Sequence, residues 1–268
     1  MKQYRRALIT GATGGIGTAF ARELPHRTDL LLTGRDRDRL EHLRAALARA
    51  GREVEVVEAD LSRVEDRDRL VSHAETFRIE LLINNAGLGA YGPVLANDAE
   101  LERAIAEVNV VATADLTRRL LPGMMARARQ AGTRAGLINV SSTLAFQPLP
   151  YLASYAASKM FVLMYTQALA AELRSEPVDV LTLCPGATRT GFGRRAGFEP
   201  GSLPGAVDPE VVARQALDAL GRRAIHVVGP IARSLLKPGL TAQHLATQVL
   251  GAAMRTFSGG ACRPKGHR

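Results

Sequence analysis

Tyr155 and Lys159 are the residues of this 268-residue chain whose spacing most clearly suggests chemistry. They lie four positions apart in an alanine-rich stretch that predicts a helix, so both side chains project from one face of it. A phenol has an ordinary pKa of about 10, and a cation at about 4 Å is expected to lower that pKa substantially. The phenol can then exchange a proton with a substrate near neutral pH, as general acid–base catalysis requires.

Two further observations support this pair. Ser141 and Ser142 end a preceding apolar strand, where a hydroxyl can hold a carbonyl oxygen that faces the tyrosine. Only four of the 35 basic residues are lysines, so chance alone would rarely place a lysine at position 159. Taken alone, the pair can also arise by chance on an exposed helix. Tyr151 and Tyr165 are excluded as alternatives, because neither has a lysine four residues later.

The elements that must position these residues alternate between strands and helices from residue 6 to about 229. The alternation predicts right-handed β-α-β crossovers, and therefore a single-domain Rossmann fold: a doubly wound parallel sheet of about seven strands flanked by helices. Such sheets bind ligands at the carboxyl ends of their strands. The expected strands are Arg6–Thr10, Leu30–Thr33, Val54–Val57, Leu81–Ile83, Leu137–Val140, Val178–Cys184 and Ile225–Val228.

Three glycines follow the first expected strand and open a helix that should end at Leu24. Gly11, Gly15 and Gly17 allow a tight turn and the close approach of a pyrophosphate. The helix start adds unpaired N–H groups and the positive end of its dipole. The stretch therefore predicts a dinucleotide-binding loop.

Several motifs together resemble the short-chain dehydrogenase/reductase superfamily over about residues 5 to 229. They are G-x-x-x-G-x-G from Gly11, N-N-A-G from Asn84, Ser142 followed after thirteen residues by Tyr155-x-x-x-Lys159, and P-G-x-x-x-T from Pro185. The resemblance implies hydride transfer between the nicotinamide C4 and a carbonyl or secondary alcohol. It also implies that Tyr155 moves the hydroxyl proton and that Ser142 bonds the substrate oxygen.

The same resemblance assigns two further catalytic roles. Lys159 would lower the tyrosine pKa and hold the nicotinamide ribose. Asn109, within a long helix expected from Asp98 to about Arg127, would hold a water that relays protons to the lysine. An asparagine among apolar helix neighbours can instead be a core amide whose hydrogen bonds are satisfied.

The resemblance implies a set of cofactor-binding residues near the strand ends. They are Gly11, Thr13, Gly14, Gly15, Ile16, Gly17, Arg35, Asp60, Leu61, Asn85, Ala86, Gly87, Tyr155, Lys159, Pro185, Gly186, Thr188 and Thr190. After the second strand an NAD enzyme usually offers an acid to the ribose, whereas this chain has Gly34 and Arg35. A guanidinium suits a 2′-phosphate, so NADP(H) is expected in preference to NAD(H).

Each of these assignments has a simpler alternative. Arg35 can be one of many surface arginines, and the N-N-A-G stretch can be a plain turn. Asp60 would contact the adenine amino group; its alternative role as a helix N-cap is better served by Ser62. The helix after the second strand is expected over Asp36–Ala50, stopped by Gly51.

Substrate specificity is expected in Phe146–Leu152 and in the Gly- and Pro-rich stretch Gly191–Val207, whose composition is typical of a mobile lid. The predicted substrate-binding residues are Ser142, Phe146, Tyr155 and Phe192. The aromatic residues, with Leu149 and Phe198, favour an apolar small-molecule substrate. The six histidines show no ligand spacing, so no metal site is expected.

The net charge of +9 belongs to the end of the chain. Residues 219–268 contain no Asp or Glu and eight basic residues, which leaves 27 basic and 26 acidic residues before them. A nearly neutral body argues against nucleic-acid binding. We therefore divide the chain into a catalytic domain at 1–229, with a cofactor half at about 1–135 and a catalytic half at about 136–229, and a basic extension at 230–268.

The extension carries a helical stripe of Leu245, Val249, Ala253 and Phe257, a short helix is expected over Ile231–Leu236, and the last ten or so residues are expected to be disordered. The stripe can pack on the body, on a second subunit of a homodimer or homotetramer, or weakly on an anionic membrane surface. No run of 18 apolar residues occurs, and the strand starting at residue 6 leaves no room for a signal peptide. With Cys184 and Cys262 far apart, a reducing cytoplasm is expected.

The sequence thus predicts an NAD(P)-dependent oxidoreductase, in particular an NADPH-dependent reductase of an apolar ketone or aldehyde. The alternative is a catalytically idle NADP(H)-sensing protein that engages a membrane surface or a partner through its basic tail. Such proteins usually lose the serine, tyrosine or lysine, and all three are present in this chain.

Overall fold

The computed structural model describes residues 4–48, 51–197 and 205–229, and in these the strands and helices alternate as expected. The strands are β1 (Arg6–Thr10), β2 (Asp29–Gly34), β3 (Val54–Glu58), β4 (Leu81–Asn84), β5 (Ala135–Val140), β6 (Val178–Pro185) and β7 (Ile225–Val228). The α-helices are α1 (Gly15–Glu23), α2 (Arg37–Leu47), α3 (Val64–Thr76), α4 (Ala99–Ala106), α5 (Ala112–Ala131), α6 (Ala153–Glu172), α7 (Phe192–Ala196) and α8 (Pro209–Ala219). Three short segments complete the set: the 3₁₀ turns η1 (Val94–Ala96) and η3 (Thr143–Phe146) and the π-helical turn η2 (Glu107–Val111).

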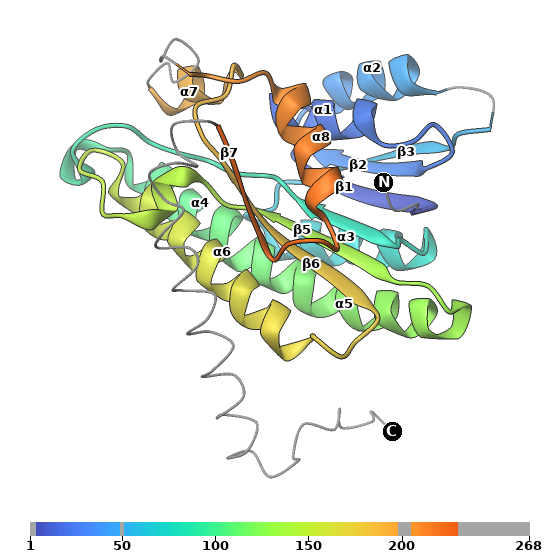
Figure 1. Ribbon diagram of the computed structural model, residues 1–268. Coiled ribbons are helices and arrows are strands. Elements are labelled where there is room, and N and C mark those ends of the chain that lie inside the picture. The colour runs from blue at the N-terminus through green and yellow to red at the C-terminus, as the bar shows by residue number, and fades with distance from the viewer. Residues whose placement is uncertain (1–3, 49–50, 198–204, 230–268) are drawn as a thin grey trace.

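All seven strands form one parallel sheet in the order β3-β2-β1-β4-β5-β6-β7 (Figure 1). Strand β1 lies in the interior, where Ile9 pairs with Leu32 of β2 on one side and with Ile83 of β4 on the other. The chain therefore runs outward to the β3 edge and then returns across β1 to continue toward β7. This is the predicted doubly wound Rossmann fold, and its reversal point lies between β1 and β4.

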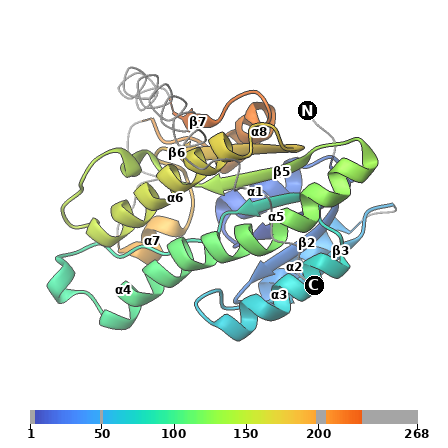
Figure 2. The same cartoon turned by 90° about the horizontal axis from the view of Figure 1, so that it is seen from below.

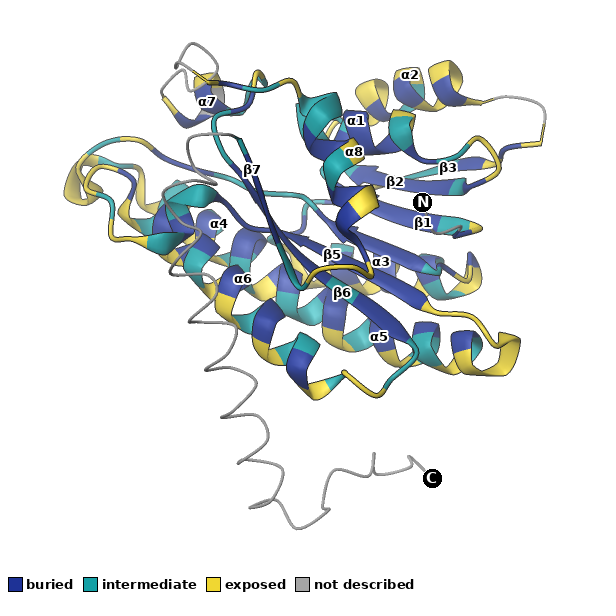
Figure 3. Cartoon of the chain, viewed as in Figure 1, coloured by how far each residue is buried: buried dark blue, intermediate teal, exposed yellow. Residues whose placement is uncertain are grey.

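Helices cover both faces of this sheet. Figures 1 and 2 show α1, α2 and α8 on one face and α3, α5 and α6 on the other. Successive residues of a strand point to opposite faces, so Ala7 and Ile9 of β1 join one core cluster while Leu8 joins the other. The central strands are buried on both faces (Figure 3), which is why their sequences are continuous apolar runs.

The predicted long helix from Asp98 is three segments instead of one. Helix α4 is capped by the Asp98 carboxylate, the π-helical turn η2 follows it, and α5 extends to Ala131 before Gly132 adopts a left-handed conformation. Single π-turns inside α-helices often lie at functional sites. Asn109 is the central residue of this turn.

Two other helix boundaries also differ from expectation. Helix α2 ends at Leu47 instead of Ala50, with Asp36 as its N-cap. Helix α3 begins at Val64 with Arg63 in the N-cap position, so the expected capping by Ser62 is wrong. The Ser62 hydroxyl instead donates a hydrogen bond to the Asp60 carboxylate.

Some predictions lie outside the described residues, namely those for the extension at 230–268 and for Phe198 and its neighbours up to residue 204. Within the described ranges, no helix is both long and apolar enough to cross a membrane, and no group of His, Cys, Asp or Glu side chains is arranged to hold a metal ion. Cys184 is buried as a free thiol.

Candidate active site

A cavity of about 450 Å³ opens at the carboxyl ends of the strands. It is lined by all the predicted cofactor-binding residues except Gly17, and by Ser142 and Phe192. Two other predicted residues do not line it. Asn109 lies behind the wall, and Phe146 packs beside a small core cluster of Ala145, Leu163, Cys184 and Val227. The structure therefore does not bring Phe146 into the site, because the turn η3 ends there against the core.

Two glycines of the loop lie where any side chain would be strained or would meet neighbouring backbone atoms. Gly11 has a positive φ of 62°, and a Cβ on Gly17 would lie 2.3 Å from the Gly11 carbonyl oxygen. Gly17 thus allows the loop to pack on helix α1 and does not itself face the cavity. The Asn85 side chain fastens the loop from the other side, donating to the carbonyls of Thr10 at 2.9 Å and Gly11 at 3.1 Å. Helix α1 has no side-chain cap, so its first N–H groups are available to an anion.

A second amide network joins the ends of β4 and β5 to the helices behind them. Asn84 donates to Asn139 at 2.9 Å and to Thr117 of α5 at 3.0 Å, and Asn139 donates to Thr166 of α6 at 2.9 Å. These four side chains are buried. The network sets the position of the catalytic helix relative to the sheet. Sequence reasoning missed Asn139, which in sequence is only a polar residue inside an apolar strand.

Asn109 is fully buried in the π-helical turn, and its amide is bound on both sides. Its oxygen accepts from the Leu88 N–H at 2.8 Å, and its nitrogen donates to the Leu88 carbonyl at 2.9 Å and to the Ser158 hydroxyl at 2.8 Å. Ser158 in turn donates to the Tyr155 carbonyl at 2.7 Å. Asn109 therefore links the segment after β4 to helix α6, and its role in holding a relay water stays a prediction.

Lys159 is buried beside this asparagine. Its Nζ donates to the Val140 carbonyl at 2.9 Å and lies 5.8 Å from the centre of the Tyr155 ring. A Cβ on Gly87 would meet that Nζ at 3.2 Å and the Asn109 oxygen at 3.4 Å, so only a glycine leaves this space open. Burial lowers the pKa of Lys159 from 10.5 to about 8.

Tyr155 has the opposite shift. Burial raises the pKa of its phenol from 10.0 to about 12, and the hydrogen bond with Ser142 opposes this increase. The expected lowering by the neighbouring ammonium is therefore wrong for this structure. Lys159 bonds to the backbone of β5 instead of the phenol oxygen, and desolvation of the phenolate outweighs its charge.

Of the two serines, Ser142 is the one that faces the phenol. Its hydroxyl lies close enough to the phenol to oppose the rise of the Tyr155 pKa, and it accepts from the Leu144 N–H at 3.1 Å. The Ser141 hydroxyl donates instead to the Lys159 carbonyl at 2.7 Å, which ties helix α6 to the end of β5. The Phe192 ring of α7 lies 5.4 Å from the Tyr155 ring, centre to centre, and gives this end of the cavity an apolar wall.

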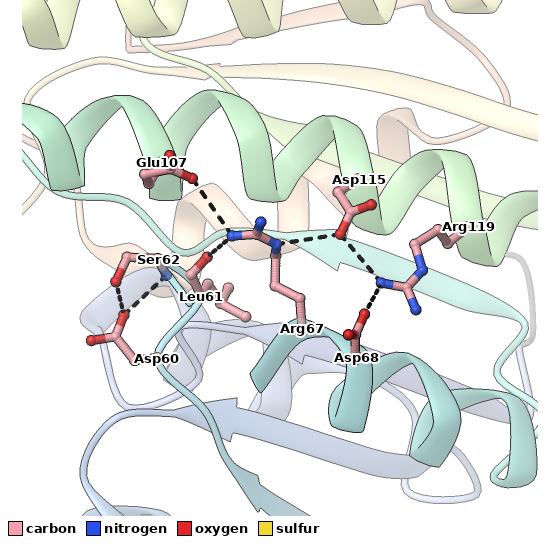
Figure 4. A network of polar contacts seen from close by, with 8 residues as sticks. All are labelled: Asp60, Leu61, Ser62, Arg67, Asp68, Glu107, Asp115 and Arg119. Atoms are coloured by element: carbon pink, nitrogen blue, oxygen red, sulfur yellow. Dashed lines mark hydrogen bonds and ion pairs between the residues drawn. The ribbon is translucent and has the colours of Figure 1, made fainter. Parts of the chain in front are cut away.

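Asp60 and Leu61 line the opposite end of the cavity. The Asp60 carboxylate accepts from the backbone and hydroxyl of Ser62, at 3.0 and 2.8 Å, which holds the loop after β3 in a turn (Figure 4). The Leu61 carbonyl accepts from the buried Arg67 guanidinium at 2.8 Å.

Arg67 connects this loop to the helix that carries Asn109. It forms ion pairs with Asp115 of α5 at 3.3 Å and with Glu107 of the π-helical turn at 3.7 Å (Figure 4). Arg119 extends the same network on the surface, with Asp68 at 2.7 Å and Asp115 at 3.5 Å. Arg67 therefore links the Leu61 loop at one end of the cavity to the π-helical turn that contains Asn109.

Arg35 lies exposed and lines the cavity, and a second exposed arginine accompanies it, while its predicted contact with a cofactor phosphate stays a prediction. Arg39 donates to the Thr13 carbonyl at 2.7 Å, which places its guanidinium at the glycine loop. Sequence reasoning missed Arg39, although it lies in the first turn of the helix that follows Arg35 and was a usable signal. Asp36 also lines the cavity, and its carboxylate caps helix α2 by accepting from the Arg39 N–H at 3.0 Å.

These features fit a dinucleotide. The glycine loop leaves backbone room at a helix N-terminus, and two exposed arginines, Arg35 and Arg39, line the same cavity. A buried Ser–Tyr pair with an adjacent lysine lies at the other end of the same cavity. The fold and the site together are those of a Rossmann-type oxidoreductase.

The comparisons with known proteins agree with that class. The family model described as short chain dehydrogenase matches residues 5–198, and the chain belongs to this family. Among curated proteins, the very-long-chain 3-oxoacyl-CoA reductase of Anas platyrhynchos is 30% identical over 224 residues, or 80% of this chain and 68% of that protein.

Solved structures of relatives carry nicotinamide cofactors. A short-chain dehydrogenase from Sphingobium yanoikuyae in complex with NADPH is 32% identical with a TM-score of 0.76, covering 90% of this chain and 94% of that one. The 3-ketoacyl-(acyl-carrier-protein) reductase from Brucella melitensis, complexed with NADH, is 28% identical with a TM-score of 0.73, covering 84% and 97%. A nicotinamide cofactor is therefore supported, and the choice between the two forms rests on the residues at the cavity edge.

Proposed function

We propose that this protein is an NADPH-dependent reductase of an apolar ketone or aldehyde. The observation that carries the proposal is the buried Ser142–Tyr155 pair facing the apolar wall of Phe192. A phenol with a pKa of about 12 is protonated at neutral pH, so it enters the reaction as a proton donor, as carbonyl reduction requires. The relative that acts on very-long-chain 3-oxoacyl-CoA supports a substrate with an apolar portion.

In this mechanism the bound nicotinamide supplies the hydride, and the protein supplies position and the proton. The Ser142 and Tyr155 hydroxyls hold the carbonyl oxygen, and Tyr155 gives its proton to that oxygen as it gains negative charge. The Lys159 ammonium lies close enough to stabilise the phenolate that remains. Phe192 and the surrounding apolar residues exclude water.

The preference for NADPH is supported by Arg35 and Arg39 together, because two guanidinium groups can share one phosphate. A homodimer or homotetramer is supported by exposed apolar side chains on the π-helical turn and α6: Val111, Phe161 and Met164. A cytoplasmic location stays a prediction.

The test measures NADPH oxidation against a panel of apolar ketones and aldehydes, with Tyr155→Phe beside the wild type. Loss of the proton donor should lower kcat by about 10²- to 10⁴-fold while NADPH still binds. Tyr165→Phe is the matched control, since it removes a hydroxyl from the same helix and should leave turnover unchanged. Equal turnover by Tyr155→Phe and wild type would reject the proposed function.

A further inference from the structure

Three segments that border the catalytic end meet at Tyr91 and Gly92. The Tyr91 N–H donates to the Ala196 carbonyl of α7 at 2.7 Å, and the Gly92 N–H donates to the Tyr151 carbonyl at 2.9 Å. The segment after β4 is thereby bonded both to α7 and to the loop that precedes helix α6. Two backbone hydrogen bonds thus hold the mouth of the site together.

Tyr151 has a backbone conformation that a bulky residue rarely adopts. Its φ is +67°, in the left-handed region, although the residue is not glycine. Such a conformation is unfavourable and persists where the surroundings impose it, often at ligand-binding positions. Here the Tyr151 carbonyl accepts the bond from Gly92, in the loop that ends just before helix α6 and four residues before the catalytic Tyr155.

The conformation brings two exposed aromatic rings together. The Tyr91 and Tyr151 rings lie 6.2 Å apart, centre to centre, at an angle of 36°. Both side chains are more than half exposed, at 52% and 56%. Val94 and Leu95 follow on the same segment and are also exposed. Exposed apolar residues that gather in a patch mark binding sites more often than single exposed side chains do.

Neither ring lines the cavity itself, but a short stretch of backbone joins the pair to the catalytic end. Gly89, two residues before Tyr91, packs so tightly that a Cβ on it would lie 3.2 Å from the Tyr155 ring and 3.0 Å from Phe192. Two residues of chain span at most about 7 Å. The Tyr91 backbone therefore lies within about 7 Å of the Gly89 backbone, which packs against the catalytic ring.

We propose that Tyr91 and Tyr151 form an aromatic rim that binds the distal apolar part of the substrate, beyond the carbonyl held by Ser142 and Tyr155. The inference rests on the proposed reductase function and narrows its substrate class. The substrate carries an alkyl chain or ring system long enough to leave the catalytic pocket and lie against these rings. Neither tyrosine takes part in the chemical step.

The experiment compares short and long alkyl methyl ketones as substrates for wild type, Tyr91→Ala and Tyr151→Asn. Asparagine tolerates a positive φ, so Tyr151→Asn removes the ring without adding backbone strain. We expect KM for the long ketone to rise about three- to tenfold per ring, with kcat nearly unchanged and with no change for the short ketone. Tyr91→Phe and Tyr151→Phe, which keep the rings, should behave as wild type.

A binding measurement makes the result independent of turnover. Calorimetric titration of a long-chain methyl ketone into the protein saturated with NADP⁺ should show weaker binding in Tyr91→Ala and Tyr151→Asn by the same factor. If the two variants bind the long ketone as wild type does and KM is unchanged, the proposed rim is wrong. It is also wrong if affinity falls equally for short and long ketones. A wild type that binds the long ketone but reduces none of the panel would reject the reductase function and leave the rim standing.

A lipid surface is the other ligand that exposed aromatic rings can meet. Sedimentation with vesicles containing phosphatidylglycerol separates the two. If vesicle binding falls in the alanine and asparagine variants while the chain-length dependence stays that of wild type, the rim is a membrane contact and the substrate assignment is wrong.

Discussion

The two ends of the cavity hold their polar groups in opposite ways. At the catalytic end, Tyr155, Lys159 and Asn109 are buried, and the hydrogen bonds of Lys159 and Asn109 run to backbone groups or to a neutral side chain. At the opposite end, Arg35 and Arg39 are exposed, and Arg67, which bonds the loop after β3, is paired with the Asp115 carboxylate. From this difference we expect reactivity to depend on desolvation, and cofactor choice to depend on charges that salt can screen.

Substitutions at the catalytic end should have the largest effects on turnover and stability. Lys159→Met tests the effect of the desolvated ammonium. Turnover should fall by about 100-fold or more, because the phenolate loses its cation. The unfolding free energy at neutral pH should nevertheless rise by about 2 kcal/mol. Removing an ammonium whose pKa is lowered to about 8 relieves roughly 3 kcal/mol of desolvation, and the lost bond to Val140 offsets about 1 kcal/mol.

The stability difference between Lys159→Met and wild type should depend on pH. Below about pH 8 the lysine is charged in both states, and the folded wild type bears the full desolvation cost. Between about 8 and 10.5 the folded state releases the proton first, so wild-type stability rises and the advantage of Lys159→Met disappears. Urea unfolding across this pH range measures it. A variant less stable than wild type at neutral pH would contradict the account.

Arg67→Leu should have the next largest effect, on stability. Arg67 is buried, and its loss would leave the Leu61 carbonyl without this donor and Asp115 with only the longer pair to Arg119, at a cost of about 2–4 kcal/mol. Arg119→Leu is the control from the same network (Figure 4), and its more exposed pairs should be worth less than about 1 kcal/mol. If urea unfolding shows the same loss of unfolding free energy in both variants, burial does not distinguish the two arginines.

Arg35→Gln and Arg39→Gln should produce the smallest effect, and it should depend on salt. We expect KM for NADPH to rise about tenfold at low ionic strength and less at high ionic strength, with KM for NADH unchanged. Arg37→Gln on the same helix is the control, because Arg37 pairs with Glu41 and does not line the cavity. A parallel rise in KM for NADH would mean that the arginines support the loop and do not select the phosphate.

Most of the fold was predictable because local signals agree with it. The strands Arg6–Thr10 and Ile225–Val228 were predicted with their observed bounds, since each is a short, largely apolar run between turn residues. The glycine loop and the Ser142–Tyr155–Lys159 spacing were equally visible, because a turn and a helical repeat are local properties.

What was missed depends on contacts between distant parts of the chain. The pKa of Tyr155 was expected to fall, because sequence shows its neighbour Lys159 but neither its burial nor the bond that Lys159 makes to Val140. The pairing of Tyr91 with Tyr151 joins residues sixty positions apart. The π-helical turn was also invisible, because one additional residue barely changes a hydrophobic pattern.

That additional residue has a consequence for how the chain tolerates insertions and deletions. One residue corresponds to about 100° of rotation in an α-helix, so the turn at Glu107–Val111 sets the phase between α4 and α5. Deleting Val110 would restore a continuous helix and rotate α4 by about that angle, turning buried Ile105 away from its present neighbours. Within the family, length changes should therefore be rare in this helix and common in the surface loops.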